Sequence, residues 1–204
     1  EKASSGGDTV QKSTLMKSGA DELKKSAEAL NNDELWEKKK NKKKDEKTGE
    51  EIEVEDYDWE AITKAVKSFV EDYNDVVEQA GNSNSKDVLR NAVWMTGITE
   101  SNENMLSKIG ITVGKGNKLL LDEEALKKAD ISSFKTLFTG HNSFADKVSM
   151  KANSISNAAA RSSGTYKVRG FMLFKLQLGN VIPEMATFLL EKKEFFKLKK
   201  VILF

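Results

Sequence analysis

The chain has 204 residues, of which 38% are hydrophobic and 32% are charged, and its formal net charge is +1. This length allows one sizeable hydrophobic core or two small ones, while a net charge so close to zero supplies no overall field that would draw the chain to nucleic acid or to a membrane. Cysteine is absent, which excludes disulfides, thiolate metal sites and thiol nucleophiles. Residues 1–7 lack the apolar core of a signal peptide, and a single proline is not typical of a fold dominated by loops.

The N-terminal region predicts a helix from about residue 9 to residue 30. Its apolar residues recur at alternating spacings of four and three, which is the pattern of the seam of a coiled coil or of a bundle helix. Asn31 and Asn32 are expected to end this helix. The predicted seam consists of Met16, Ala20, Leu23, Ala27 and Leu30.

A strongly polarised segment follows, in which a basic run, a turn over residues 45–49 and an acidic run succeed one another. Apolar residues alternate with carboxylates in the acidic run, which is typical of a half-exposed strand. We therefore predict a β-hairpin at about 35–58 whose arms carry opposite charge and pair across the strands. The candidate charged surface of this hairpin comprises Lys38, Lys39, Lys40, Lys42, Lys43, Lys44, Glu51, Glu53 and Glu55.

The lysine run also has a second interpretation, as a patch for nucleic acid or for lipid head groups. The acidic arm next to it would neutralise such a patch, and no aromatic residue is interleaved with the lysines. The sequence therefore favours the paired hairpin and makes nucleic acid the less expected partner.

The clearest helix is predicted from about Asp58 to Ala80, where a broad apolar stripe includes Trp59, Phe69 and Tyr73. Aromatic residues that could line a ligand box occur in this stripe. At helical spacing they are more typical of a hydrophobic core, so we expect them to be buried.

Residues 81–85 are expected to form a flexible break before another helix, which begins at about Lys86. Gly97 is expected to kink or divide this region, and a further helical stretch from about Glu100 leads to residue 109. The buried face of the first of these helices is predicted to include Val88, Leu89, Ala92 and Val93.

Residues 109–126 predict a strand, a tight turn, a second strand and a capped helix start. Apolar residues alternate in both predicted strands, and the turn at 114–117 contains residues that tolerate positive φ angles. We therefore predict a second small hairpin at about 109–121. Asp122 follows it and can cap the next helix by accepting hydrogen bonds from free amides, while two glutamates favour the positive end of the helix dipole.

Three further helical segments are predicted at about 123–129, 131–138 and 144–160. The last has its own seam at spacings of four and three, formed by Phe144, Val148, Ala152, Ile155 and Ala159. Small residues are frequent in this seam and in the N-terminal one. We therefore expect these two helices to pack closely together with the helix at 58–80.

The order of these segments resembles the C-terminal region of bacterial flagellar filament cap proteins. Residues 65–74 are similar to a family helix of the type Ser-Phe-Val-x-x-Tyr-Asn, which Ser68, Phe69, Val70, Tyr73 and Asn74 match. Segments like 108–112 and 118–122, the pair Leu137-Phe138 and the helix at 144–160 then follow in the family's order. The resemblance covers about residues 59–164 and rests on short structural motifs.

The resemblance implies a helical, coil-forming assembly element with protein partners and a secreted or cell-surface location, although a cytoplasmic location is also compatible. The capping of a filament does not follow from it. The chain has no room for the large head domains of the family, and only the hairpin at about 35–58 occupies their place. It therefore resembles a minimal relative.

The last residues, 167–204, differ in composition from the rest. No serine or aspartate occurs after residue 164, although six of the ten phenylalanines do. The apolar run at 181–190 is too short to span a bilayer. Three interpretations stay open: a contact with a membrane surface, a segment packed on the bundle or disordered, and a break in composition left by a reading-frame change.

The sequence offers little support for catalysis. His141 is the only histidine and lies in a predicted loop, where a capping or solvated role is more typical than a triad or a metal site. Gly114-Lys115-Gly116 lacks the spacing and ending of a phosphate-binding loop. Residues 122–124 would bind a cation weakly at most, and their position at a helix start explains them.

We therefore predict a mainly α chain (α+β), with a helical-bundle or coiled-coil-like core and two small hairpins, organised as one helical domain over 1–166. We expect a structural or assembly protein rather than an enzyme, with no cofactor, metal or small-molecule substrate. The alternative is a soluble binding module that uses the charged hairpin at 38–55. The expected contact of the assembly protein, with itself or with partner subunits, is a seam of Met16, Leu23, Leu30, Val148 and Ile155.

Overall fold

The computed structural model describes residues 8–44 and 51–162, and for residues 41–44 and 51–54 it describes the backbone alone. The predictions made for residues 1–7, for the turn at 45–49 and for the tail at 167–204 lie outside the described residues. The helices are α1 (Val10–Leu30), α2 (Trp59–Gly81), α3 (Lys86–Ser101), α4 (Glu103–Lys108), α5 (Glu123–Lys128), α6 (Ile131–Phe138) and α7 (Phe144–Ser162). The strands are β1 (Lys38–Lys44), β2 (Glu51–Tyr57), β3 (Ile111–Val113) and β4 (Leu119–Leu121), and two 3₁₀ turns lie at Asp33–Trp36 and Lys115–Asn117.

Most of the described residues are helical, and the strands form two separate two-stranded antiparallel sheets. The predicted fold class, mainly α with two small hairpins, is confirmed. The predicted start of the first helix is also confirmed, because Thr9 is its cap and the Thr9 hydroxyl accepts a hydrogen bond from the Lys12 amide at 3.3 Å. Asp58 caps α2 in the same way.

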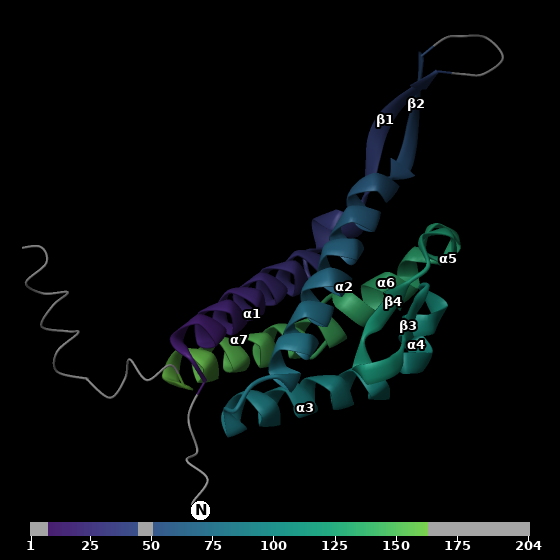
Figure 1. The fold of residues 1–204 in the computed structure, drawn as a ribbon. Coiled ribbons are helices and arrows are strands. Elements are labelled where there is room, and N and C mark those ends of the chain that lie inside the picture. Colours follow the sequence, from purple (N-terminus) through teal and green to yellow (C-terminus); the bar gives the residue numbers. More distant parts are fainter. Residues whose placement is uncertain (1–7, 45–50, 163–204) are drawn as a thin grey trace, which may run out of the picture. The chain divides into compact units, whose positions relative to one another are not determined.

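The helical bundle is built around α1, which packs against both α7 and α2, while α3 packs against α7 (Figure 1). Three hydrogen bonds between α1 and α7 show that these helices are antiparallel. They join Ser13 to Ser162 at 3.1 Å, Asp21 to Ser156 at 2.6 Å, and Glu28 to Ser149 at 3.3 Å. Small buried residues on both helices allow this close approach. They are Ala20, Ala27, Ala152 and Ala159.

The buried face of α3 corrects the sequence prediction. Its buried residues are Val88, Ala92, Met95 and Thr99, while Leu89 is 37% exposed and Val93 is 69% exposed. Successive residues of an α-helix are rotated by about 100°, so Val93 points well away from the face that Val88 and Ala92 define. The predicted kink at Gly97 is also wrong, because α3 runs through that glycine and the break comes at Asn102.

The second hairpin lies as predicted, with β3 paired to β4 from Ile111 opposite Leu121 to Val113 opposite Leu119. Gly116 and Asn117 have positive φ angles of 69° and 61° in the turn between them, as a short loop requires.

The cap after this hairpin is confirmed as well. The Asp122 carboxylate accepts hydrogen bonds from the amides of Glu124 and Ala125, both at 3.0 Å. These two amides belong to the first turn of α5, where they have no partner inside the helix. The side chain of one residue therefore fixes the point at which the chain leaves the strand and becomes helical.

Candidate functional site

The charged hairpin forms a two-stranded ribbon of β1 and β2, which we call the charged ribbon. Its register sets Lys40 opposite Glu55, Lys42 opposite Glu53 and Lys44 opposite Glu51. The predicted pairing of oppositely charged arms is therefore confirmed at the level of the backbone. Directly opposite charges contribute roughly 0.2–1 kcal/mol each to an antiparallel pair, so the charge pattern helps to select this register.

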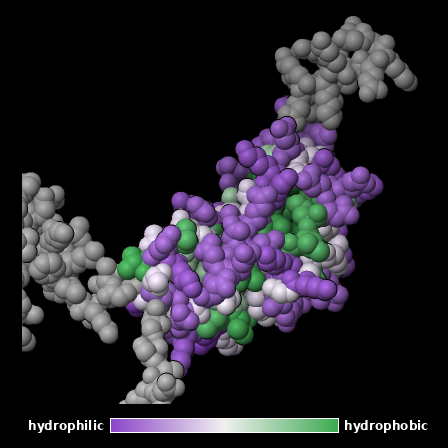
Figure 2. Space-filling model, viewed as in Figure 1, coloured by the Kyte–Doolittle hydropathy of each residue, from purple (hydrophilic) through white to green (hydrophobic). Residues whose placement is uncertain are grey.

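The charged ribbon extends beyond the start of α2, away from the other helices (Figure 1). Its two strands pack mainly on each other. Lys38, Lys39, Lys40 and Glu55 are all exposed, and the surface around the base of the ribbon is dominated by hydrophilic residues (Figure 2). All of the predicted charged residues therefore lie on this projecting element, and a partner has access to these four.

The base of the ribbon is fixed by contacts to the start of α2. The Lys38 ammonium lies 5.6 Å from the centre of the Tyr57 ring, and the Lys39 ammonium lies 3.4 Å from an Asp58 carboxylate oxygen. Asp58 also accepts a hydrogen bond from the Ala61 amide at 3.0 Å. This bond lowers the pKa of Asp58, and Lys39 lowers it further, which together outweigh the partial loss of solvent.

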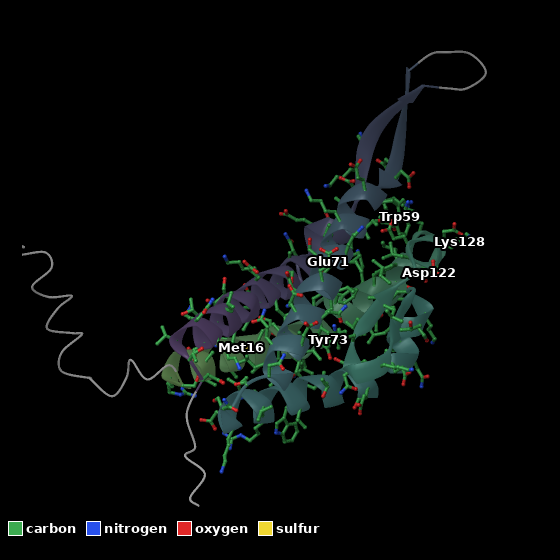
Figure 3. The ribbon with its side chains drawn as sticks, in the orientation of Figure 1. Met16, Trp59, Glu71, Tyr73, Asp122 and Lys128 are labelled. Atoms are coloured by element: carbon green, nitrogen blue, oxygen red, sulfur yellow. The ribbon has the colours of Figure 1, made fainter. Side chains whose placement is uncertain are left out.

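An aromatic stack continues from this base into the core. Tyr57 contacts Trp59 edge to face at 6.2 Å, and Trp59 contacts Phe134 at 6.3 Å. Figure 3 shows Trp59 at the start of α2, next to the ribbon. The ribbon is thus attached to the bundle through packed rings and not through a loose linker.

Trp36 is a further aromatic residue of this attachment. It lies two residues before β1 and is fully buried. It stacks on Phe134 at 5.2 Å and on Phe138 at 5.8 Å, and its indole donates a hydrogen bond to the Leu30 carbonyl at 2.9 Å. No periodicity or motif in the sequence predicted this role. The available signal was a large aromatic residue between the end of a helix and the first lysine of the ribbon.

The seam predicted as an intermolecular contact lies inside the chain. Its side chains are at most 4% exposed and face one another between α1 and α7. The expectation is corrected accordingly: in this fold the seam completes the core of one chain and offers no surface to a second. The spacing of four and three requires a helical partner, and here α7 of the same chain supplies it. The residues concerned are Met16, Leu23, Leu30, Val148 and Ile155.

The residues that carry the family resemblance hold neighbouring elements against α2. Tyr73 donates a hydrogen bond to the Thr99 hydroxyl at 2.8 Å, and burial raises the pKa of Tyr73 to about 12. The Asn74 side chain bonds both backbone groups of Leu119, accepting from its N–H at 2.7 Å and donating to its carbonyl at 2.9 Å. Phe69 packs against Phe138 and other rings in the core. Each of these contacts is structural.

The residues considered for catalysis or for metal binding are not gathered into a site. His141 is exposed and faces the Asp146 carboxylate at 3.3 Å, and Asp122 uses one oxygen in its helix cap. Within residues 8–44 and 51–162, no group of three or more histidine, aspartate or glutamate side chains is placed to hold a metal ion. Among the helices that the structure describes, none has the length and apolar character needed to cross a membrane.

A concave site lies where the N-terminal end of α1 meets the C-terminal end of α2. It has a volume of about 270 Å³. The Asp8 carboxylate beside it is already engaged, by the Ser83 hydroxyl and by the Asn84 amide at 2.7 Å. This carboxylate ties the residues just before α1 to the loop after α2, which is a structural role.

Comparison with models of known protein families, with curated proteins and with solved structures finds no match for this chain. The architecture itself therefore defines the class: a helical bundle that presents a charged two-stranded ribbon.

Proposed function

We propose that this protein is a structural or assembly protein that contacts a partner subunit through the charged ribbon. The observation that carries the proposal is the contrast between its two candidate contacts. The helix seam is enclosed within the chain, whereas Lys38, Lys39, Lys40 and Glu55 of the ribbon are exposed, and the base of the ribbon contacts Asp58 and Trp59. A surface that is both accessible and held in one orientation loses little conformational entropy on binding.

The order of the helical elements supports an assembly role like that of flagellar filament cap proteins. A long helix, a second helix, a small hairpin, short helices and a final helix follow one another in α2 to α7, which is the order that the resemblance implies. The ribbon occupies the place of the large head domains. We therefore propose a minimal relative of this family, in a secreted or cell-surface setting.

The charge pattern favours a protein partner over nucleic acid. Four of the six lysines of the basic strand stand directly opposite carboxylates of the acidic strand, so most of the positive charge of β1 has a negative charge next to it. Binding to a polyanion draws its strength from uncompensated cations that release counterions, and the acidic strand opposes this. Alternating charges instead suit a protein surface with a complementary pattern. We assign the protein no catalytic role.

A charge-swapped ribbon tests this proposal. Replacing Lys40, Lys42 and Lys44 by Glu, and Glu51, Glu53 and Glu55 by Lys, preserves every opposite-charge pair within the ribbon while it inverts the polarity towards a partner. We expect cross-linked capture from the cells that produce the protein to recover specific subunits with the wild-type chain. The swapped chain should lose them, and so should the wild-type chain at 1 M salt, where the screening length falls to about 3 Å.

The proposal fails if the swapped chain captures the same subunits as the wild-type chain. A gel shift with DNA and RNA is the control. Binding there that weakens steeply with salt and is lost on removing the lysines would favour the nucleic-acid alternative.

A further inference from the structure

We propose that charged ribbons of two copies of this chain pair edge to edge, with the basic β1 of one copy against the acidic β2 of the next. The inference rests on the proposed function of the ribbon as a contact surface, and it names the partner as a second copy. It goes beyond that function because it fixes which edge meets which edge and what symmetry follows.

Both outer edges of the ribbon are open to pairing. In the part of the chain that the structure describes, β1 and β2 pair only with each other, so each strand has one edge whose backbone groups lack a neighbouring strand. The register runs one to one from Lys38 opposite Tyr57 to Lys44 opposite Glu51 without a bulge, and neither strand contains proline or glycine. Proline and bulges, which commonly block a strand edge, are therefore absent from the two described strands, whereas charge, which also blocks edges, is present.

The distribution of charge selects one kind of pairing. Strand β1 contains six lysines, and β2 contains the four carboxylates of Glu51, Glu53, Glu55 and Asp56. Pairing β1 with a second β1 would set lysines against lysines, and pairing β2 with a second β2 would set carboxylates against carboxylates. Like charges directly opposite one another are destabilising in a sheet. Only a β1 edge against a β2 edge brings opposite charges together.

The geometry of such a pair follows from the ribbon itself. Because β1 and β2 are antiparallel, two ribbons that point in the same direction bring β1 of one antiparallel to β2 of the other. The intermolecular pair can then repeat the register of the intramolecular one, with Lys40, Lys42 and Lys44 opposite carboxylates of the neighbour. The sheet continues from copy to copy with the same pairing.

The interface is therefore head to tail. Each added copy leaves one basic edge and one acidic edge free, so the contact generates a ring if its rotation closes and an open row if it does not. It does not stop at a symmetric dimer, which would need identical edges to meet. Since the attraction depends on exposed charges, association should be strongest at low ionic strength.

The first experiment is sedimentation velocity of the full chain over a range of concentrations at low salt and at 1 M salt. We expect species larger than a monomer to grow with concentration at low salt and to disappear at 1 M salt. Two single-arm variants accompany the wild-type chain. One carries K40E, K42E and K44E and has an acidic ribbon, and the other carries E51K, E53K and E55K and has a basic ribbon.

The variants test whether pairing requires oppositely charged edges, even where a single-arm ribbon is poorly formed. Each single-arm variant alone should stay monomeric, and an equimolar mixture of the two should associate, because every edge then has an oppositely charged neighbour. The charge-swapped chain, which keeps its internal pairs, should self-associate like the wild-type chain. Helical circular dichroism of all variants should match the wild-type signal, since the bundle does not depend on these residues.

Two results would overturn the inference: a wild-type chain that stays monomeric at low salt up to its solubility limit, or single-arm variants that associate as the wild-type chain does. These failures are separate from failure of the proposed function. A monomeric chain whose capture of other subunits is lost on charge swapping would leave the proposed function standing. Self-association without capture of any other subunit would instead restrict the partner to copies of this chain.

Discussion

Removing the Trp36 side chain should destabilise the bundle more than any change on the surface of the ribbon. Trp36 is fully buried, although it lies only two residues before β1. In Trp36→Ala the chain loses two aromatic stacks, at 5.2 and 5.8 Å, and gains a cavity. Replacing a buried tryptophan by alanine costs about 3–5 kcal/mol, and the lost indole hydrogen bond to Leu30 is part of that cost.

The variant Trp36→Phe separates the two contributions. A phenylalanine keeps an aromatic ring in the stack but removes the indole N–H, which leaves the Leu30 carbonyl without this donor. We expect a loss of about 1–3 kcal/mol, from the hydrogen bond and from the smaller ring together. The control is Trp94→Ala. Trp94 is 62% exposed and contacts only the Lys151 ammonium among the described cations, at 5.5 Å, so its loss should cost about 0.5–1 kcal/mol at most.

Urea denaturation followed by far-ultraviolet circular dichroism measures all three variants without relying on tryptophan fluorescence. For a chain of this size, 3–5 kcal/mol corresponds to a fall in melting temperature of roughly 6–20 °C. Equal stabilities for Trp36→Ala and Trp94→Ala would refute the reasoning, because they would mean that the stack at the base of the ribbon does not join it to the core.

Three further changes test other parts of the fold. Gly110→Ala should cost about 2–5 kcal/mol by denaturation, because Gly110 has a φ of 82° and an added Cβ would lie 2.6 Å from the Asp122 backbone oxygen. The control is Gly97→Ala, which adds its Cβ in open space within a helix and should stabilise the chain by up to about 1 kcal/mol. Asn74→Ala should cost about 1–3 kcal/mol and increase amide exchange in β4, whose backbone it clamps; unchanged exchange would contradict this role. Burial, together with neighbouring carboxylates, raises the pKa of Asp72, so its ionised form opposes folding. Asp72→Asn should therefore stabilise the chain at pH 7. This gain should vanish below the unfolded-state pKa of aspartate, where both states are protonated, and denaturation over a range of pH measures it.

Local signals in the sequence predicted most of the fold. The caps at Thr9, Asp58 and Asp122 were predictable because each is a contact between a side chain and amides two or three residues away. The seams of α1 and α7 were predictable because a buried helix face repeats at fixed spacing. The pairing of the two arms of the charged ribbon was predictable from opposite charges flanking one turn, whereas the register itself comes from the structure.

Contacts between distant segments could not be predicted in this way. The stack of Trp36 on Phe134 joins residues that no periodicity relates, and the clamp of Asn74 on Leu119 spans 45 residues. The prediction of the buried face of α3 was wrong for a similar reason. Leu89 and Val93 are as apolar as the residues it buries, and only the placement of α2 and α7 decides which face is covered.

The motif that suggests the flagellar cap family does not identify a contact surface, because its residues make contacts between distant segments inside the fold. Within that motif Phe69 packs on rings of α6 and α7, Tyr73 bonds Thr99 of α3, and Asn74 bonds the backbone of β4. One short stretch of α2 therefore holds four elements in place, and its residues specify an architecture. A protein that shares such a motif would share the arrangement of helices while its exposed elements were free to change. Here the exposed element is the charged ribbon, so partner choice should follow its charges, and changes to the motif should act on stability alone.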